Sequence, residues 1–100
     1  MKPELEQLKA ALQRACQAQN ATVITSGRAD ILAMPRDSVL ANIESVAAQS
    51  LSLSDEWEYR RLLELYAQLD QGLVKRLVAQ GLGDANPEVR ETAEDFESRI

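Results

Sequence analysis

Hydrophobic residues recur at three- and four-residue steps along most of this 100-residue chain, which is the spacing of one face of an α-helix. The first such stripe consists of Leu5, Leu8, Leu12 and Ala15. Pro3 stands at the start of this stripe, and acidic residues follow in the first turn. We therefore predict a first helix from Pro3 to about Gln19, with Asn20 as its end.

Residues 21–34 carry a mixed pattern. Thr22–Thr25 favours a β-strand, Ser26-Gly27 favours a turn, and Ala29–Met34 is apolar again. The segment is compatible with a small hairpin or with a loop that leads into a one-turn helix capped by Ser26. We predict the second arrangement, because an isolated two-stranded hairpin is only marginally stable.

Two further helices are predicted in the middle of the chain. The pyrrolidine ring of Pro35 pushes the preceding residue out of the α region, so the next helix begins at Pro35 or Asp37 and ends near Ser50. Ser52 and Ser54 then supply capping hydroxyls, with acidic residues in the first turn, for a helix that ends near Leu69.

Residues 70–100 predict two more helices. Asp70 caps the first of them, and Gly81 and Gly83 are candidates for a left-handed end. Asn86 and Pro87 begin the second. The chain is therefore predicted to be an all-α bundle of five helices in a single domain over residues 1–100.

The second half of the sequence repeats itself at an offset of thirty residues. Glu58-Tyr59-Arg60 and Glu88-Val89-Arg90 each open an amphipathic stretch. The matching apolar positions are Leu62, Leu63 and Tyr66 in one stretch and Thr92, Ala93 and Phe96 in the other. A helix pair of this kind buries its stripe by stacking on a neighbour. Residues 35–69 and 70–100 are thus predicted to be two helix pairs stacked on the N-terminal helix, which with the short-helix segment makes up residues 1–34.

The residues from Leu73 to Ile100 resemble a HEAT-type repeat, a helix pair with an Asp in the turn and Val-Arg at the start of the second helix. The residues that carry the resemblance are Leu77, Val78, Gly83, Asp84, Asn86, Pro87, Val89, Arg90, Ala93 and Phe96. The earlier unit departs from this pattern, because Trp57 replaces a turn residue and Asp55 is displaced by one position. The resemblance implies two degenerate HEAT-like pairs.

Charge is concentrated in the second half. Residues 1–50 hold five acidic and five basic residues, so residues 51–100 account for the whole net charge of −5. An acidic surface repels phosphate backbones, which argues against nucleic-acid binding. A basic protein partner is favoured instead.

The residue types exclude several chemistries. The chain has no histidine, and its one cysteine, Cys16, lies on the apolar side of the first helix, where a buried hydrophobe is favoured over a reactive thiol. A closed zinc site, a disulfide framework and a Ser-His-Asp triad are therefore not expected. The paired carboxylates lie on polar helix faces, where catalysis is disfavoured. We expect no enzyme activity, no metal and no cofactor.

No apolar run approaches the ~18 residues of a membrane span, and residues 1–19 do not have the pattern of a secretion signal. A cytoplasmic location is the resulting expectation.

Three residues allow two interpretations. Arg60 and Arg90 could bind anions, but bonds to turn carbonyls or to a carboxylate such as Asp84 are favoured. Trp57 lies two residues before the core position of Tyr59. Either it packs in the core or it is an exposed aromatic anchor surrounded by acids.

Residues 35–97 also resemble small helical bacterial immunity proteins of polymorphic or contact-dependent toxin systems. The segments that carry this resemblance are Val39–Glu44, Asp55–Leu65, Leu77-Val78 and Asn86–Phe96. It implies a non-catalytic inhibitor that masks the active site or substrate groove of a cognate toxin domain. The expected binding residues are Asp55, Trp57, Glu58, Glu88, Glu91 and Asp95. The alternative is a helical scaffold or assembly subunit that binds another protein or itself through the Leu5–Ala15 stripe, and the oligomeric state stays open.

Overall fold

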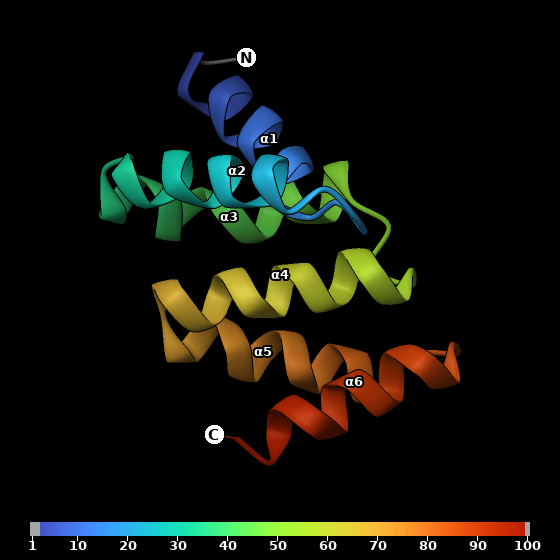
Figure 1. Ribbon diagram of the computed structural model, residues 1–100. Coiled ribbons are helices and arrows are strands. Elements are labelled where there is room, and N and C mark those ends of the chain that lie inside the picture. The colour runs from blue at the N-terminus through green and yellow to red at the C-terminus, as the bar shows by residue number, and fades with distance from the viewer. Residues whose placement is uncertain (1–2, 100) are drawn as a thin grey trace. The chain divides into compact units, whose positions relative to one another are not determined.

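The computed structural model describes residues 3–99. Within that range it contains helices and no strand (Figure 1). The helices are α1 (Pro3–Ala15), α2 (Ala21–Ala33), α3 (Arg36–Ser50), α4 (Glu56–Leu69), α5 (Gln71–Leu82) and α6 (Pro87–Glu97). The all-α prediction is confirmed, whereas the predicted number of five helices is wrong, because the described residues form six.

The chain divides into two compact units, Met1–Leu51 with α1, α2 and α3, and Ser52–Ile100 with α4, α5 and α6. The boundary lies between α3 and α4. The two helices of the predicted pair over residues 35–69 therefore belong to different units, while both helices of the pair over residues 70–100 belong to one. Each unit is described separately below.

In the first unit, α1 packs against both α2 and α3. Leu8, Leu12 and Ala15 of the N-terminal stripe are at most 3% exposed, as predicted for a core face. Cys16, which directly follows α1, is 1% exposed, so the prediction of a buried cysteine is confirmed. With the stripe packed in the core, only Leu5 at its start remains half-buried.

The predicted loop and one-turn helix over residues 21–34 are wrong, because this segment forms the thirteen-residue helix α2. Asn20 takes a left-handed conformation (φ 77°), and its side chain accepts a hydrogen bond from Val23 N at 3.3 Å, so it caps α2. α1 ends at Ala15, four residues before its predicted end. Ser26 is not a cap but an exposed residue within α2.

The reason for the helix lies in its packing. Ile24, Gly27 and Ile31 are the buried residues of α2, and their spacing places them on one face. Gly27 allows the backbones of the two helices to approach closely, since a Cβ atom at this position would lie within 2.6 Å of backbone atoms of Ala11 and Ala15 in α1. This tertiary contact overrides the local β preference of residues 22–25.

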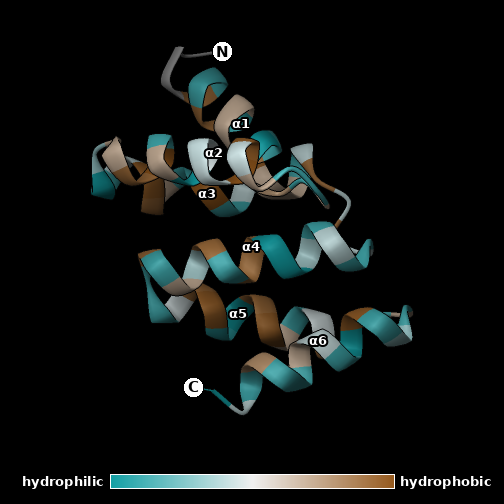
Figure 2. Ribbon diagram, viewed as in Figure 1, coloured by the Kyte–Doolittle hydropathy of each residue, from teal (hydrophilic) through white to brown (hydrophobic). Residues whose placement is uncertain are grey.

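In the second unit, α5 packs against both α4 and α6. Hydrophobic residues recur along α5 in Figure 2, and five of its residues are buried. The Tyr59 hydroxyl of α4 donates a hydrogen bond to the Leu77 carbonyl of α5 at 2.8 Å within the core. Tyr59 and Val89, which the thirty-residue offset equates, are both 0% exposed.

Two of the predicted capping residues are confirmed, because the side chains of Asp70 and Asn86 each accept a backbone hydrogen bond at the start of α5 and α6. The predicted hydroxyl cap of α4 is wrong, because the side chain of Asp55 caps this helix. The prediction that Gly81 or Gly83 gives α5 a left-handed end is wrong, because Gly83 has a φ of −97° and Gly81 lies inside the helix. Gly81 is present because a side chain there would collide with the ring and hydroxyl of Tyr59.

Candidate functional site

Trp57 is an exposed residue on the first turn of α4, with 44% of its surface accessible. The interpretation of Trp57 as a core residue is therefore wrong. Its ring lies under the guanidinium of Arg61, one helical turn later, with 5.4 Å between the guanidinium carbon and the ring centroid. Arg61 in turn binds Glu64, with 3.0 Å between Nη1 and Oε1. Trp57, Arg61 and Glu64 thus form a row along α4.

Three of the predicted binding residues lie along α6. Glu88, Glu91 and Asp95 are all exposed, and their spacing of three and four residues places them on one side of the helix. The opposite side of α6 buries Val89, Thr92, Ala93 and Phe96. Arg99 pairs with Asp95 at 2.7 Å and so neutralises part of this charge.

The first turn of α4 meets the first turn of α6 through a pair of carboxyl groups. A side-chain hydrogen bond between Glu56 and Glu88 raises the pKa of Glu56 above its ordinary value of 4.5; burial and the charges of Glu88 and Glu91 raise it further, and Arg60 opposes the shift. The hydrogen bond with Glu88 favours the protonated form of Glu56, and the negative charges of Glu88 and Glu91 act in the same direction. We call Glu56, Glu88, Glu91 and Asp95 the acidic face.

Glu56 is absent from the residues predicted to bind a partner. A sequence signal existed, because Glu56 is one of three acidic residues at the start of α4. Its proximity to Glu88 depends on how α4 packs against α6, and no spacing in the sequence reveals this packing.

Two predicted binding residues do not join the acidic face. The Asp55 carboxylate caps α4 by accepting a hydrogen bond from Glu58 N at 3.0 Å. Glu58 follows Glu56 by two residues and so points about 200° away from it around the helix. Its carboxylate accepts a hydrogen bond from Ser52 N at 3.4 Å. Asp55 and Glu58 therefore stabilise the start of α4.

The two repeated arginines have structural partners. Arg90 donates to the carbonyl oxygens of Asp84 and Ala85 at 2.7 and 3.1 Å, so the prediction of bonds to the turn is confirmed for this residue. Arg60 of α4 instead reaches the Thr92 hydroxyl of α6 at 3.4 Å. Both arginines fasten parts of the second unit together.

The turn before α6 is held by a small polar network. Asp84 accepts hydrogen bonds from Asn86 N at 2.8 Å and from the Ser54 hydroxyl at 2.9 Å. These two bonds, with the nearby charge of Arg90, lower the pKa of Asp84. Asn86 Nδ2 also donates to the Ser54 carbonyl at 2.9 Å. The network connects the segment before α4 to the segment before α6 and uses the polar groups of both.

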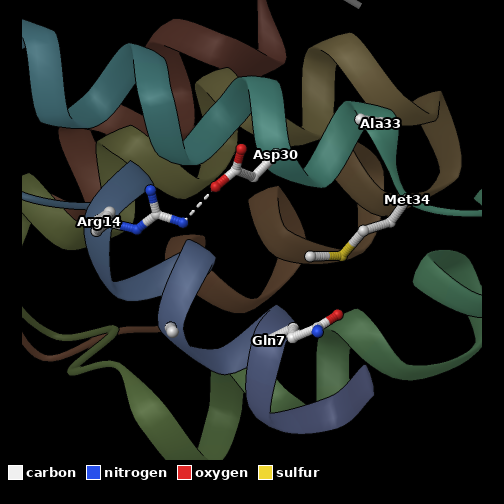
Figure 3. A pocket seen from close by; sticks show the side chains of 6 residues that line it. Gln7, Arg14, Asp30, Ala33 and Met34 are labelled. Carbon is white, nitrogen blue, oxygen red and sulfur yellow. Dashed lines mark hydrogen bonds and ion pairs between the residues drawn. The ribbon is translucent and has the colours of Figure 1, made fainter. Parts of the chain in front are cut away.

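The first unit contains a surface cavity of about 390 Å³ between α1 and α2 (Figure 3). Figure 3 shows Arg14 and Asp30 paired on its wall, with Gln7 and Met34 extending toward it. Arg14 also donates to the Ser26 hydroxyl at 3.0 Å. The charged groups of this cavity are therefore engaged with each other.

Within residues 3–99, no group of three or more His, Cys, Asp or Glu side chains is arranged to hold a metal ion. Across the same part of the chain, no helix is both long and apolar enough to cross a membrane. No known protein family, no curated protein and no solved structure matches this chain. Within the described residues it is an all-α protein with acidic residues on α4 and α6 and an exposed tryptophan on the first turn of α4.

Proposed function

We propose that this protein is a non-catalytic inhibitor of the immunity type, which neutralises a cognate bacterial toxin by masking its active site or substrate groove. The observation that carries this proposal is the acidic face of α4 and α6, with the exposed Trp57 next to Glu56 on α4. We propose the cytoplasm as the place of action, and a basic toxin domain as the partner.

Electrostatics favours a basic partner. The second unit holds the entire net charge of −5, and a hydrogen bond with Glu88 together with the charges of Glu88 and Glu91 raises the pKa of Glu56. A cationic side chain bound at Glu56 and Glu88 would favour the charged form of both. Long-range attraction of a basic surface would also speed the encounter of the two proteins.

Trp57 supplies the apolar part of the proposed contact. Tryptophan is enriched among the residues that dominate binding energy at protein interfaces. A side chain that is 44% exposed and next to an acidic residue on each side would be protected from nonspecific association by its charged neighbours. The proposed binding surface is therefore Trp57 together with Glu56, Glu88, Glu91 and Asp95.

The HEAT-like character is part of the proposal for the pair α5–α6. These helices pack against each other, and Asp84 and Arg90, two residues that carry the resemblance, form hydrogen bonds within the turn that joins them. Helix pairs of this type commonly present a surface to other proteins. For residues 35–69 the proposal is restricted to a sequence repeat, because α3 and α4 belong to different units.

The proposal excludes catalysis, a cofactor and nucleic-acid binding, for the reasons given by the residue types and the charge. Glu88, Glu91 and Asp95 are exposed, whereas an acid-base pair of carboxyl groups works in a cleft that separates their pKa values. The single domain expected over residues 1–100 remains a prediction.

Coexpression tests the proposal directly. The product of the gene adjacent to that of this protein is expressed in a bacterial host with and without this chain. We expect the neighbouring product to arrest growth, this chain to restore growth, and the two proteins to copurify. Glu91→Lys should weaken the rescue, whereas Glu97→Lys, the same charge change about 120° away around α6, should leave it intact. Rescue without copurification would refute an inhibitor that acts by masking.

The alternative is a helical scaffold that associates with itself through the stripe of α1. Leu8, Leu12 and Ala15 are at most 3% exposed, so this stripe is already used within the protein. The inhibitor role is for this reason the better supported of the two.

A further inference from the structure

Trp57 is the only tryptophan in the chain. The residue that contacts its ring, Arg61, is basic, whereas the two residues that flank Trp57 in the sequence are acidic. The guanidinium of Arg61 lies 5.4 Å from the centroid of the indole ring. Both carboxylate oxygens of Glu64 accept from Arg61 Nη1, at 3.0 and 3.4 Å. The side chain of Arg61 is 22% exposed, so it lies deeper than the indole that it contacts.

A cation at this place weakens attraction to a basic partner, because it reduces the negative charge beside the acidic face. Its contacts suggest a different contribution. A guanidinium over an aromatic ring restricts that ring, and Glu64 restricts the guanidinium in turn. An exposed tryptophan that is already held in one conformation loses less entropy when a partner immobilises it.

We infer that Arg61 is a positioning residue that holds the indole of Trp57 in the conformation in which it enters an apolar slot on a basic protein partner. This inference rests on the proposed function and extends it to the partner's surface. The slot receives the indole, and lysine or arginine side chains line its edge, because Glu56 and Glu58 flank Trp57 in the sequence and the second unit holds the net charge of −5.

The first measurement needs no partner. Time-resolved fluorescence anisotropy of the free protein reports on Trp57 alone. Arg61→Gln removes the cation, and we expect faster local motion of the indole and a lower residual anisotropy. Arg61→Lys keeps the charge and should restore part of the effect. Lys75→Gln removes one positive charge from an exposed position on α5 and should change nothing. Circular dichroism confirms that each variant is folded.

The second measurement is the binding kinetics of the same variants with the adjacent-gene product. Arg61→Gln should raise the dissociation rate by about threefold to tenfold, the expected effect of losing one pre-ordered side chain. Its association rate should stay equal or rise, because a positive charge has been removed. A variant that merely removed charge would change the association rate alone.

The outcomes separate the two proposals. If Arg61→Gln changes neither the anisotropy nor the dissociation rate, the positioning role of Arg61 is overturned. The inhibitor proposal is upheld in that case if the wild-type protein binds the adjacent-gene product. Failure of the wild-type protein to bind the adjacent-gene product would overturn the inhibitor and the slot, while the anisotropy would still decide whether Arg61 restrains Trp57.

Discussion

Replacing Gly27 with alanine should destabilise the protein, although the helix propensities of the two residues predict the opposite. Gly27 lies in the interior of α2, where alanine is favoured over glycine by about 1 kcal/mol. In this helix, however, a Cβ atom would lie 2.5 Å from Ala15 N and 2.6 Å from Ala11 O. Ordinary contacts begin at 3.4 Å, so the new atom would be too close to both.

The magnitude follows from what must move. Both obstructing atoms belong to the backbone of α1, which cannot rotate away as a side chain can. Relief requires the two helices to separate, which loosens the packing around Ile24 and Ile31. Inserting a group into a well-packed core costs about 1–3 kcal/mol, and a backbone obstruction places this case near ~3 kcal/mol. After the gain in propensity, a net loss of about 2 kcal/mol is expected.

Urea denaturation followed by circular dichroism measures this loss. In thermal melts, 2 kcal/mol corresponds to a decrease in Tm of roughly 8–16 °C for a protein of this size. Gly83→Ala is the control, because a Cβ atom there meets only Gln80 O at 3.8 Å and the φ of −97° suits alanine. A Gly27→Ala protein as stable as the wild type, or more stable, would refute the close approach of α1 and α2.

Three further predictions concern the second unit. Tyr59→Phe should lower the free energy of unfolding by about 1 kcal/mol in urea denaturation, since it removes a buried hydrogen bond. Burial also raises the pKa of Tyr59 from 10.0 to about 12. The stability that the neutral Tyr59 contributes should therefore be complete below pH 10 and lost as the pH rises through 12, and absorbance titration checks the pKa. Glu88→Gln should lower the pKa of Glu56 toward 4.5, as measured by NMR titration. The wild type should lose stability as the pH rises through the raised pKa of Glu56, and the variant should lose less. An unchanged titration would contradict the pairing of the two carboxyl groups. Phe96→Ala should cost about 3–5 kcal/mol by creating a cavity, whereas Glu91→Ala on the exposed side should stay within ~0.5 kcal/mol, and equal losses would mean that the faces of α6 are assigned wrongly.

The sequence predicts the second unit well because its signals are local. Asp70 and Asn86 cap the helices that they were expected to cap, and Asp55, the cap of α4, directly follows the serine expected there, since a side-chain oxygen next to an amphipathic stretch needs no distant partner. Arg90 reaches the turn that immediately precedes its own helix. Local chemistry of this kind can be deduced from spacing alone.

The first unit was predicted less well because α2 depends on a contact far away in the sequence. Gly27 next to Ser26 is typical of a turn, and Thr22–Thr25 of a strand. Only the approach of α2 to the backbone of α1 explains a glycine within a helix. Ile24 and Ile31 do stand seven residues apart, which is the helical signal that was present.

Prediction of the candidate site was partial for the same reason. Glu88, Glu91 and Asp95 share one side of α6, which follows from their spacing alone. Trp57 lies about 200° around α4 from the buried Tyr59, so its exposure could have been deduced from the helical pattern. The carboxyl pair of Glu56 and Glu88 could not, because it depends on the packing of two helices.

The most direct test of the acidic face is the association rate with the adjacent-gene product at low and at physiological salt. Exposed charges act over a Debye length of about 8–10 Å at physiological ionic strength, so the wild-type rate should fall as salt is added. Reversing Glu91 and Asp95 to lysine should slow association and remove most of this salt dependence, whereas Glu97→Lys should retain both. Association that is independent of salt, with unchanged affinity in the reversed protein, would contradict binding through the acidic face.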